Sequence, residues 1–150
     1  MLEPGEDAPT VTADNQYGES VTLDFTDPTV LFFYPADFTD GCTVEAREFQ
    51  SVLPQFREGG ITVYGVSTDD AETHAEFVEA EGLLFDLLSD PDGEVAAAFG
   101  VDTTDGRAAR RTVVLAEGRV VETYDPPRAD PSGHAEAVLR DVRNEFVQGG

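Results

Sequence analysis

The stretch Val30-Leu31-Phe32-Phe33-Tyr34 is apolar throughout, and Pro35 ends it. An unbroken β-prone run of this kind predicts a central strand of a sheet that is buried on both faces. A second such run covers residues 61–67, directly after the Gly59-Gly60 pair. The two runs therefore predict the centre of one sheet, with a crossover segment between them.

A helix is expected in this crossover, over residues 42–56. Its apolar residues recur at helical spacing and predict one buried stripe. They are Val44, Phe49, Val52, Leu53 and Phe56. Pro54 is expected to kink or close the helix near its end.

The rest of the chain continues the alternation of strands and helices. We expect strands at residues 10–13, 20–24, 84–88, 110–115 and 119–124, and helices at residues 71–81, 92–99 and 132–147. The expected N-terminal caps of these helices are Asp69 or Asp70, Asp92 and Ser132. The inner face of the last helix is expected to hold Ala135, Val138, Leu139, Val142 and Phe146.

This order of elements predicts a single domain over residues 1–150. Strands separated by helices require right-handed crossovers and a sheet with helices on both faces. The first two strands form an N-terminal β-hairpin, and a later hairpin adds an antiparallel edge, so the central sheet is mixed. The predicted fold class is α/β with a thioredoxin-like arrangement, although the pattern alone also suits other α/β sandwiches.

The net charge of the chain limits the kinds of partner that it is expected to bind. It has 31 acidic and 9 basic residues, for a formal net charge of -22, and every basic residue is arginine. Such a field repels nucleic acid and anionic membranes, so neither is expected as a partner. Heavy acid without lysine resembles the proteins of extreme halophiles. We expect stability to rise with salt, because a Debye length of about 3 Å at 1 M screens the self-repulsion.

The single cysteine and the N-terminus indicate a compartment. One cysteine forms no intramolecular disulfide. Residues 1–7 have neither the basic nor the apolar region of a signal peptide, and no apolar run approaches the roughly 20 residues that span a bilayer. We expect a cytoplasmic protein in which a lone thiol stays reduced.

Cys42 lies between the first central strand and the start of the next helix. Unsatisfied N–H groups and the positive end of the helix dipole stabilise an anion at such a place, and the thiolate is the reactive form of cysteine. Gly41 lets the backbone turn tightly there. An inert buried cysteine is the alternative, but the polar neighbours Asp40 and Thr43 argue against an apolar pocket.

The segment Phe33-Tyr34-Pro35-Ala36-Asp37-Phe38-Thr39-Asp40-Gly41-Cys42-Thr43-Val44-Glu45-Ala46 resembles the active-site loop of peroxiredoxins, above all the bacterioferritin comigratory protein or Q-type branch. The motif is Pro, three residues, Thr, two residues, Cys. The resemblance extends over nearly the whole chain. Gly5-Glu6-Asp7-Ala8-Pro9, Gly65-Val66-Ser67 and His134-Ala135 also fit the family pattern.

The resemblance implies a thiol peroxidase that uses no metal and no organic cofactor. Cys42 would be the peroxidatic cysteine, which attacks a peroxide oxygen and becomes a sulfenic acid. The Thr39 hydroxyl would accept from the incoming peroxide while donating to the thiolate. Pro35, which has no N–H, would shield the site from solvent.

An arginine from the later strand would hold the thiolate and stabilise charge on the leaving oxygen. Spacing assigns that role to Arg110, and strand alternation puts Arg111 on the opposite face, so only one of the two points inward. Glu45 matches the family's acid one turn into the helix, and it would orient the arginine through a bidentate contact.

The sequence departs from the Q-type pattern at two positions. Many members carry a resolving cysteine five positions after the first, where this chain has Arg47. The resemblance is therefore to a one-cysteine variant that is reduced by an external thiol, which would be a small thiol, a thioredoxin-like protein or a second subunit's Cys42. Asp40 replaces a common proline and adds a negative charge beside the thiolate. The family pattern allows a monomer or a homodimer.

Two other functions fit a lone reactive cysteine. One is a redox sensor with negligible turnover, and the other is a thioredoxin-fold module that exchanges disulfides. The combination of Pro35, Thr39 and Arg110 favours the peroxidase, because a pure exchange site has no use for a peroxide clamp. His74 and His134 lack zinc-type spacing and are expected on helix surfaces.

Overall fold

The computed structural model describes residues 1–126 and 131–147, with the side chains of all of these except Phe146 and Val147. Within them the main sheet has seven strands in the order β2-β1-β5-β4-β3-β8-β9. The strands are β1 (Val11–Asp14), β2 (Ser20–Leu23), β3 (Thr29–Phe33), β4 (Thr62–Ser67), β5 (Asp86–Ser89), β8 (Arg111–Ala116) and β9 (Arg119–Tyr124). A separate small sheet pairs β6 (Thr103–Thr104) with β7 (Arg107–Ala108).

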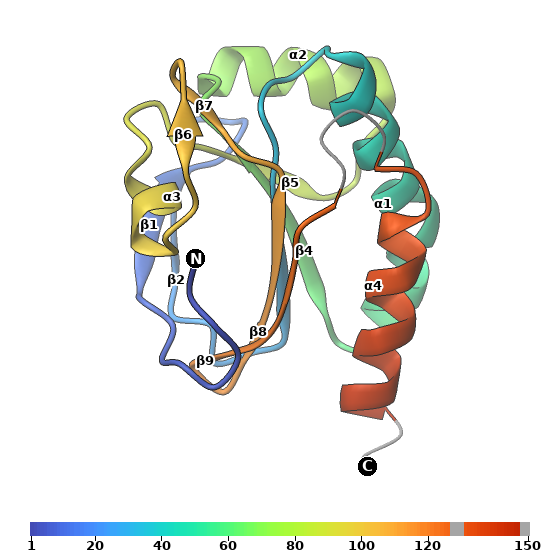
Figure 1. Ribbon diagram of the computed structural model, residues 1–150. Helices are drawn as coiled ribbons and strands as arrows, with labels where there is room; N and C mark the ends of the chain where they lie inside the picture. Colours follow the sequence, from blue (N-terminus) through green and yellow to red (C-terminus); the bar gives the residue numbers. More distant parts are fainter. Residues whose placement is uncertain (127–130, 148–150) are drawn as a thin grey trace.

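Helices cover both faces of the main sheet, as the sequence predicts. They are α1 (Asp40–Glu58), α2 (Ala71–Glu81), α3 (Glu94–Ala98) and α4 (His134–Val142), and a π-helical turn, η1 (Arg143–Val147), continues α4. Figure 1 shows the sheet nearly edge-on, with α1 and α4 side by side against one face and α3 on the other side. Among the described residues, no helix combines the length and the apolar content needed to cross a bilayer.

Strand β3 lies at the centre of the sheet. It pairs parallel with β4 and antiparallel with β8, and all of its residues are buried. Strand β5 extends the parallel set, and β1 of the N-terminal hairpin pairs antiparallel with β5. The sheet is therefore mixed, with antiparallel strands on both sides of the parallel centre, and the thioredoxin-like fold is confirmed.

The side chains of β3 alternate between two apolar cores because a strand has a period of two. Phe32 faces α1 and stacks on Phe49, with ring centroids 4.5 Å apart. Phe33 faces the α3 side, where its ring lies 5.9 Å from that of Phe99. Gly65 of β4 passes so close that a Cβ there would lie 2.8 Å from the Phe32 ring. Only glycine fits this crossing without displacing the ring.

Helix α1 starts at Asp40, earlier than expected, and ends at Glu58. Its buried residues are Cys42, Glu45, Ala46, Phe49, Val52, Leu53 and Phe56. These recur at intervals of three and four, which leaves Val44 off the stripe and 37% exposed. The prediction that Val44 belongs to the buried stripe is therefore wrong. Pro54 lies inside the helix and does not end it.

Two helix caps come from aspartates, and one of them differs from the prediction. Asp70 caps α2, where its carboxylate accepts from a first-turn N–H at 2.8 Å. The carboxylate that caps α3 belongs to the buried Asp90, which accepts from two N–H groups at 2.9 and 3.0 Å, and not to the exposed Asp92. The turn that follows Asp90 contains Gly93 at φ 70°, and this turn carries the Asp90 carboxylate onto the helix start.

Helix α4 also begins differently from the prediction. Its N-cap is Gly133, at φ 80°, and not Ser132. The helix is shorter than expected because it passes into the π-helical turn after Val142. Ala135, Val138, Leu139 and Val142 are buried, as predicted. The side chain of Phe146, the fifth residue expected on this face, lies outside the described residues.

Candidate active site

Cys42 lies in the first turn of α1, and its residue is only 2% exposed. The loop that leaves β3 reaches the helix through Thr39, the N-cap residue, whose backbone is extended. The first intrahelical bond runs from the Thr43 N–H to the Thr39 carbonyl at 2.8 Å. The N–H groups of this turn have no earlier carbonyl within the helix to bind, so the sulfur lies at the positive end of the helix dipole.

Arg110, which directly precedes β8, contacts Cys42 although the two residues are 68 positions apart in the sequence. Its Nη2 donates to the Cys42 Sγ at 3.4 Å, and its Nη1 donates to the Glu45 Oε1 at 2.6 Å. The arginine and glutamate side chains are 3% and 1% exposed. One guanidinium thus joins the sulfur to the carboxylate through two different nitrogens.

Arg110 and Arg111 point in opposite directions, and Arg110 contacts only one oxygen of Glu45. Arg110 points inward, whereas Arg111 turns away, donating to the Arg110 carbonyl and pairing with Asp125, both at 2.7 Å. The expected bidentate contact with Glu45 is wrong, because one arm of the guanidinium goes to Cys42. The second oxygen, Glu45 Oε2, is buried without a hydrogen-bond partner among the described residues.

Burial and the neighbouring charges act in opposite directions on the pKa of Glu45, and likewise on the pKa of Arg110. Burial raises the pKa of Glu45 to about 7, although the neighbouring guanidinium favours the carboxylate. Burial also disfavours the charged form of Arg110, but the Glu45 carboxylate and the Cys42 sulfur outweigh that effect and raise the pKa of Arg110. The cation is thus kept in the interior by two groups that can carry negative charge.

The loop before Cys42 places Pro35 in the interior and leaves Thr39 half-buried. The Thr39 hydroxyl donates to the Ala36 carbonyl at 2.8 Å, and not to the Cys42 sulfur as the resemblance implied. Its oxygen retains lone pairs that can accept from a substrate. Asp40 is exposed in the first helical turn, where the helix dipole favours an acid and offsets its charge.

Both histidines are buried, so the prediction that they lie on helix surfaces is wrong. His74 is fully buried and bonds Asp37 and the Leu88 carbonyl. His134, 9% exposed, bonds the Thr112 hydroxyl at 2.7 Å. Burial, with a smaller contribution from Arg110, lowers the pKa of His134 to about 4. A sequence signal existed for each, because each lies on the apolar stripe of its helix, His74 three residues before Phe77.

Asp37, Asp69 and His74 bring possible ligand atoms within 4.8 Å of one another. The same atoms already bond within the protein. Both oxygens of Asp37 are bonded, and one oxygen of Asp69 accepts from the Asp37 N–H and from the Ser67 hydroxyl, each at 2.7 Å. This cluster is a hydrogen-bond network and not an open cage for a cation.

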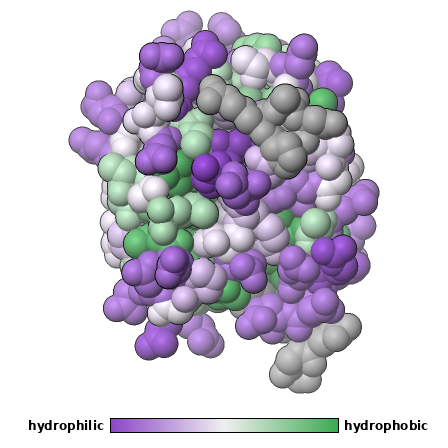
Figure 2. Space-filling model, viewed as in Figure 1, coloured by the Kyte–Doolittle hydropathy of each residue, from purple (hydrophilic) through white to green (hydrophobic). Residues whose placement is uncertain are grey.

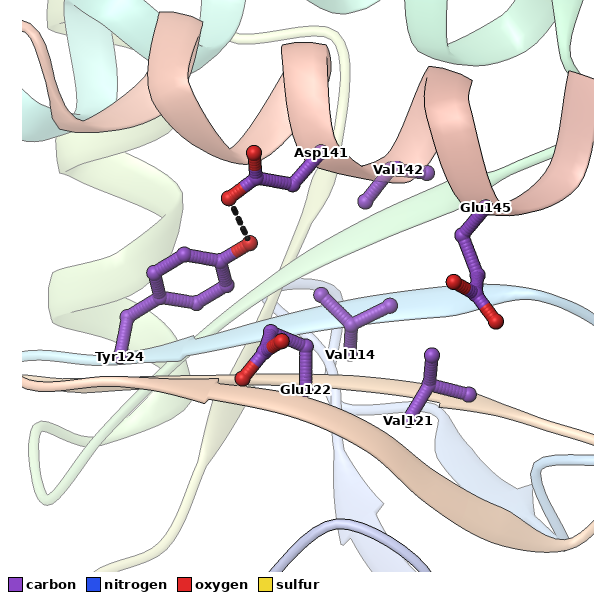
Figure 3. Close-up of a pocket in the computed structure, with 7 residues that line it drawn as sticks. All are labelled: Val114, Val121, Glu122, Tyr124, Asp141, Val142 and Glu145. Carbon is purple, nitrogen blue, oxygen red and sulfur yellow. Dashed lines mark hydrogen bonds between the residues drawn. The ribbon is translucent and has the colours of Figure 1, made fainter. Parts of the chain in front are cut away.

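A pocket between β9 and α4 does not contain the cysteine. It is lined by Val114, Val121, Glu122, Tyr124, Asp141, Val142 and Glu145 (Figure 3). The Tyr124 hydroxyl donates to Asp141 at 2.8 Å, and the remaining polar side chains are acids. Without a nucleophile or a cation, this pocket is not the reactive site.

The reactive geometry agrees with comparisons to known proteins. Residues 4–123 match the AhpC/TSA family model. The chain belongs to the AhpC/TSA family. It is a peroxiredoxin of the Bcp/PrxQ type with one cysteine, and therefore a thiol-dependent peroxidase. Peroxiredoxins act on peroxides with thiol reductants, and the resemblance read from the loop around Cys42 is confirmed.

Relatives match this peroxiredoxin over nearly all of its length. The peroxiredoxin Bcp of Escherichia coli is 36% identical over 148 residues, which cover 92% of this chain and 94% of that protein. The crystal structure of peroxidoxin BcpB from Mycobacterium tuberculosis has a TM-score of 0.88 at 32% identity, covering 96% and 98% of the two chains. The bacterioferritin comigratory protein of Xanthomonas campestris, studied for alkyl peroxide reduction, has a TM-score of 0.80 at 32% identity, covering 91% and 92%.

Proposed function

We propose that Cys42 is the peroxidatic nucleophile and that Arg110, Glu45, Thr39 and Pro35 form its peroxide site. The observation that carries this proposal is the buried contact of 3.4 Å between the Arg110 Nη2 and the Cys42 Sγ. A guanidinium at this distance stabilises a thiolate and also faces the place where charge develops on a leaving oxygen.

The proposed reaction is a two-electron transfer from sulfur to peroxide. The Cys42 thiolate attacks the terminal peroxide oxygen, the S–O bond forms, and the O–O bond breaks. Sulfur is oxidised to the sulfenic acid. The other oxygen leaves as an alkoxide or hydroxide and takes a proton from solvent, giving an alcohol or water. Both hydrogen peroxide and organic hydroperoxides fit this scheme.

Each supporting residue has a separate proposed role. Arg110 holds the thiolate and neutralises the leaving oxygen, and Glu45 orients the guanidinium through its Nη1. The Thr39 oxygen accepts the hydrogen of the incoming hydroperoxide. Pro35 excludes water, because its buried ring offers no N–H.

Resolution of the sulfenic acid requires a thiol from outside the chain, since Cys42 is its single cysteine. We propose a small thiol, a thioredoxin-like protein or a second copy's Cys42 as that thiol. Arg47, at the position of the usual resolving cysteine, instead forms an ion pair with Glu81 at the end of α2. Because Cys42 is 2% exposed, the attacking thiol reaches it only when the first turn of α1 opens.

We also propose a cytoplasmic, high-salt setting for a single-domain protein that works as a monomer or homodimer. The support is the net charge of -22 without lysine. Figure 2 shows hydrophilic residues around the rim of one face of the molecule, with apolar residues between them. A net charge of this size is strongly self-repelling unless salt screens it.

The test is stopped-flow oxidation of the reduced protein by hydrogen peroxide in molar salt, with the sulfenic acid trapped at Cys42 and identified by mass spectrometry. We expect a second-order rate constant several orders of magnitude above that of a free thiol. The Cys42→Ser variant serves as the control and should have no peroxidase activity. A wild-type rate equal to that of free cysteine, or activity that survives in Cys42→Ser, overturns the proposal.

A further inference from the structure

Asp37 lies in the middle of the loop that joins β3 to α1, and its carboxylate is fully buried. Its Oδ1 accepts from the Tyr34 hydroxyl at 2.5 Å, and its Oδ2 lies 2.6 Å from the Nδ1 of His74 in α2. The His74 ring is equally buried. A loop residue next to the reactive site is thus joined to the end of β3 and to a helix far along the chain.

The hydrogen bonds determine where protons lie on His74. Its Nε2 is 3.0 Å from the Leu88 carbonyl, which only accepts, so the Nε2 carries a hydrogen. The contact between Nδ1 and Asp37 Oδ2 needs one more proton, shared between the two groups. The pair is therefore either imidazolium with carboxylate or neutral imidazole with carboxylic acid. In both forms every atom of these contacts is satisfied, which is what a buried polar network requires.

A second set of contacts holds the same loop. The Asp37 N–H donates to Asp69 at 2.7 Å. Phe38, the next residue, has a left-handed backbone at φ 63°. This conformation is unfavourable for a bulky residue. Its ring packs edge-on against Phe77 of α2, 5.1 Å away. A strained residue persists only where its surroundings over-determine it, and here the surroundings are α2 and the end of β4.

We propose that His74 and Asp37 are positioning residues for peroxide reduction, holding the loop of residues 35–39 so that Pro35 and Thr39 stand at Cys42. Neither is within bonding reach of the sulfur in the contacts of the described residues, so both act through the loop. This inference rests on the proposed function of Cys42. It goes beyond that function by extending the site to α2 and to a residue in a different part of the sequence.

The network does not serve merely to attach α2 to the fold. The helix already has an aspartate cap at its start and buries Phe77 in the core. The bonds of His74 run instead to the loop and to β5. Within the loop, the Thr39 hydroxyl donates to the Ala36 carbonyl. These two residues flank Asp37 in the sequence. Displacement of Asp37 should therefore move both ends of that contact.

The test compares two reactions of Cys42 in matched variants. Peroxide needs the loop, whereas iodoacetamide needs only an accessible thiolate. Asp37→Ala should lower the rate constant with hydrogen peroxide by about 10- to 100-fold and that with iodoacetamide by less than about threefold. Asp37→Asn should stay within about threefold of wild type, because its amide can donate to neutral His74 and its oxygen can accept from Tyr34.

Two further variants separate positioning from stability. Asp90→Ala also removes a buried carboxylate with two hydrogen bonds, but at the start of α3. It should lower the melting temperature and leave the ratio of the two rate constants unchanged. Tyr34→Phe removes one bond and keeps the ring, so it should fold and lower the ratio by about threefold even if Asp37→Ala does not fold.

The outcomes distinguish this inference from the proposed function. A fast wild type in which Asp37→Ala and Tyr34→Phe keep the wild-type ratio overturns the positioning role and leaves the peroxidase intact. A fall in the ratio for Asp90→Ala equal to that for Asp37→Ala overturns it as well. A wild type no faster than free cysteine overturns the proposed function, and the positioning role with it.

Discussion

The Arg110 Nη2 lies 3.4 Å from the Cys42 Sγ, although the two residues are 68 positions apart in the sequence. Strand register produces this contact. Antiparallel pairing places Arg111, the first residue of β8, opposite Phe33, the last residue of β3. Arg110 therefore comes just before β8, at the point where the loop to α1 begins. Its buried side chain lies against Cys42 in the first turn of α1.

Loss of this cation should slow peroxide attack. We expect Arg110→Ala to lower the rate constant with hydrogen peroxide by about 100-fold, the usual effect of removing one preorganised donor. Arg110→Lys should recover part of this loss, because an ammonium is a point charge and lacks the fork that serves Glu45 and Cys42 together. Stopped-flow kinetics on both variants check this. Arg111→Ala is the matched control and should change the rate by less than about twofold, and an equal loss there would contradict the assignment.

Glu45 should give the protein a pH-dependent stability. Its pKa in the fold is about 7, raised mainly by burial from an ordinary 4.5. The folded state therefore holds this proton more tightly than the unfolded state does. The contribution of the group to stability is present below pH 4.5 and is lost as the pH rises through about 7. The loss amounts to about 3 kcal/mol, from about 1.4 kcal/mol per pKa unit.

Urea unfolding of wild type and Glu45→Gln at pH 4.5 and pH 8 measures the contribution of Glu45 to the free energy of unfolding. The glutamine keeps the shape and an oxygen for Arg110 but does not titrate. The difference in unfolding free energy between the two proteins should change across this range, with wild type losing more as the pH rises. Parallel pH profiles for the two proteins would show that Glu45 does not titrate in this interval.

Thr39 should matter for peroxide and little for alkylation. Thr39→Val removes both the bond to the Ala36 carbonyl and the acceptor for the substrate. We expect a fall of about 10- to 100-fold in the rate constant with hydrogen peroxide, the size expected for the loss of one strong hydrogen bond. Iodoacetamide labelling of Cys42 should change by less than about twofold. Thr39→Ser, which keeps the hydroxyl, is the control, and a loss as large as that of the valine variant would argue against a hydrogen-bonding role.

Salt should stabilise the whole protein. The net charge is -22, and screening at about 1 M salt removes most of the long-range repulsion. The melting temperature, followed by circular dichroism, should rise between dilute buffer and molar potassium chloride. Sucrose at matched osmolarity controls for general solvent effects. Equal melting temperatures in dilute and molar salt would refute the idea that charge repulsion limits stability.

The sequence by itself determined the central strand, the candidate cysteine and the family. The run before Pro35 is apolar at every position and rich in β-prone residues, which favours a strand buried on both faces, and it falls in β3, where every residue is buried. Pro35, Thr39 and Cys42 lie close together in the sequence, so their motif can be recognised without knowledge of the fold. The sequence also singled out the pair Arg110 and Arg111, but the structure decided which of them points inward, because Arg110 precedes β8 and strand alternation does not reach it.

Only the tertiary structure decided which polar groups meet. His74 reaches Asp37 across 37 positions of sequence, and Asp90 rather than Asp92 turns onto the start of α3. The fork of Arg110 between Cys42 and Glu45, and the turn of the Thr39 hydroxyl toward Ala36, are likewise visible only in the fold. The physical reason is that periodicity reports which face of an element is buried, whereas hydrogen bonds require donors and acceptors to come within about 3 Å, and packing between elements sets that distance.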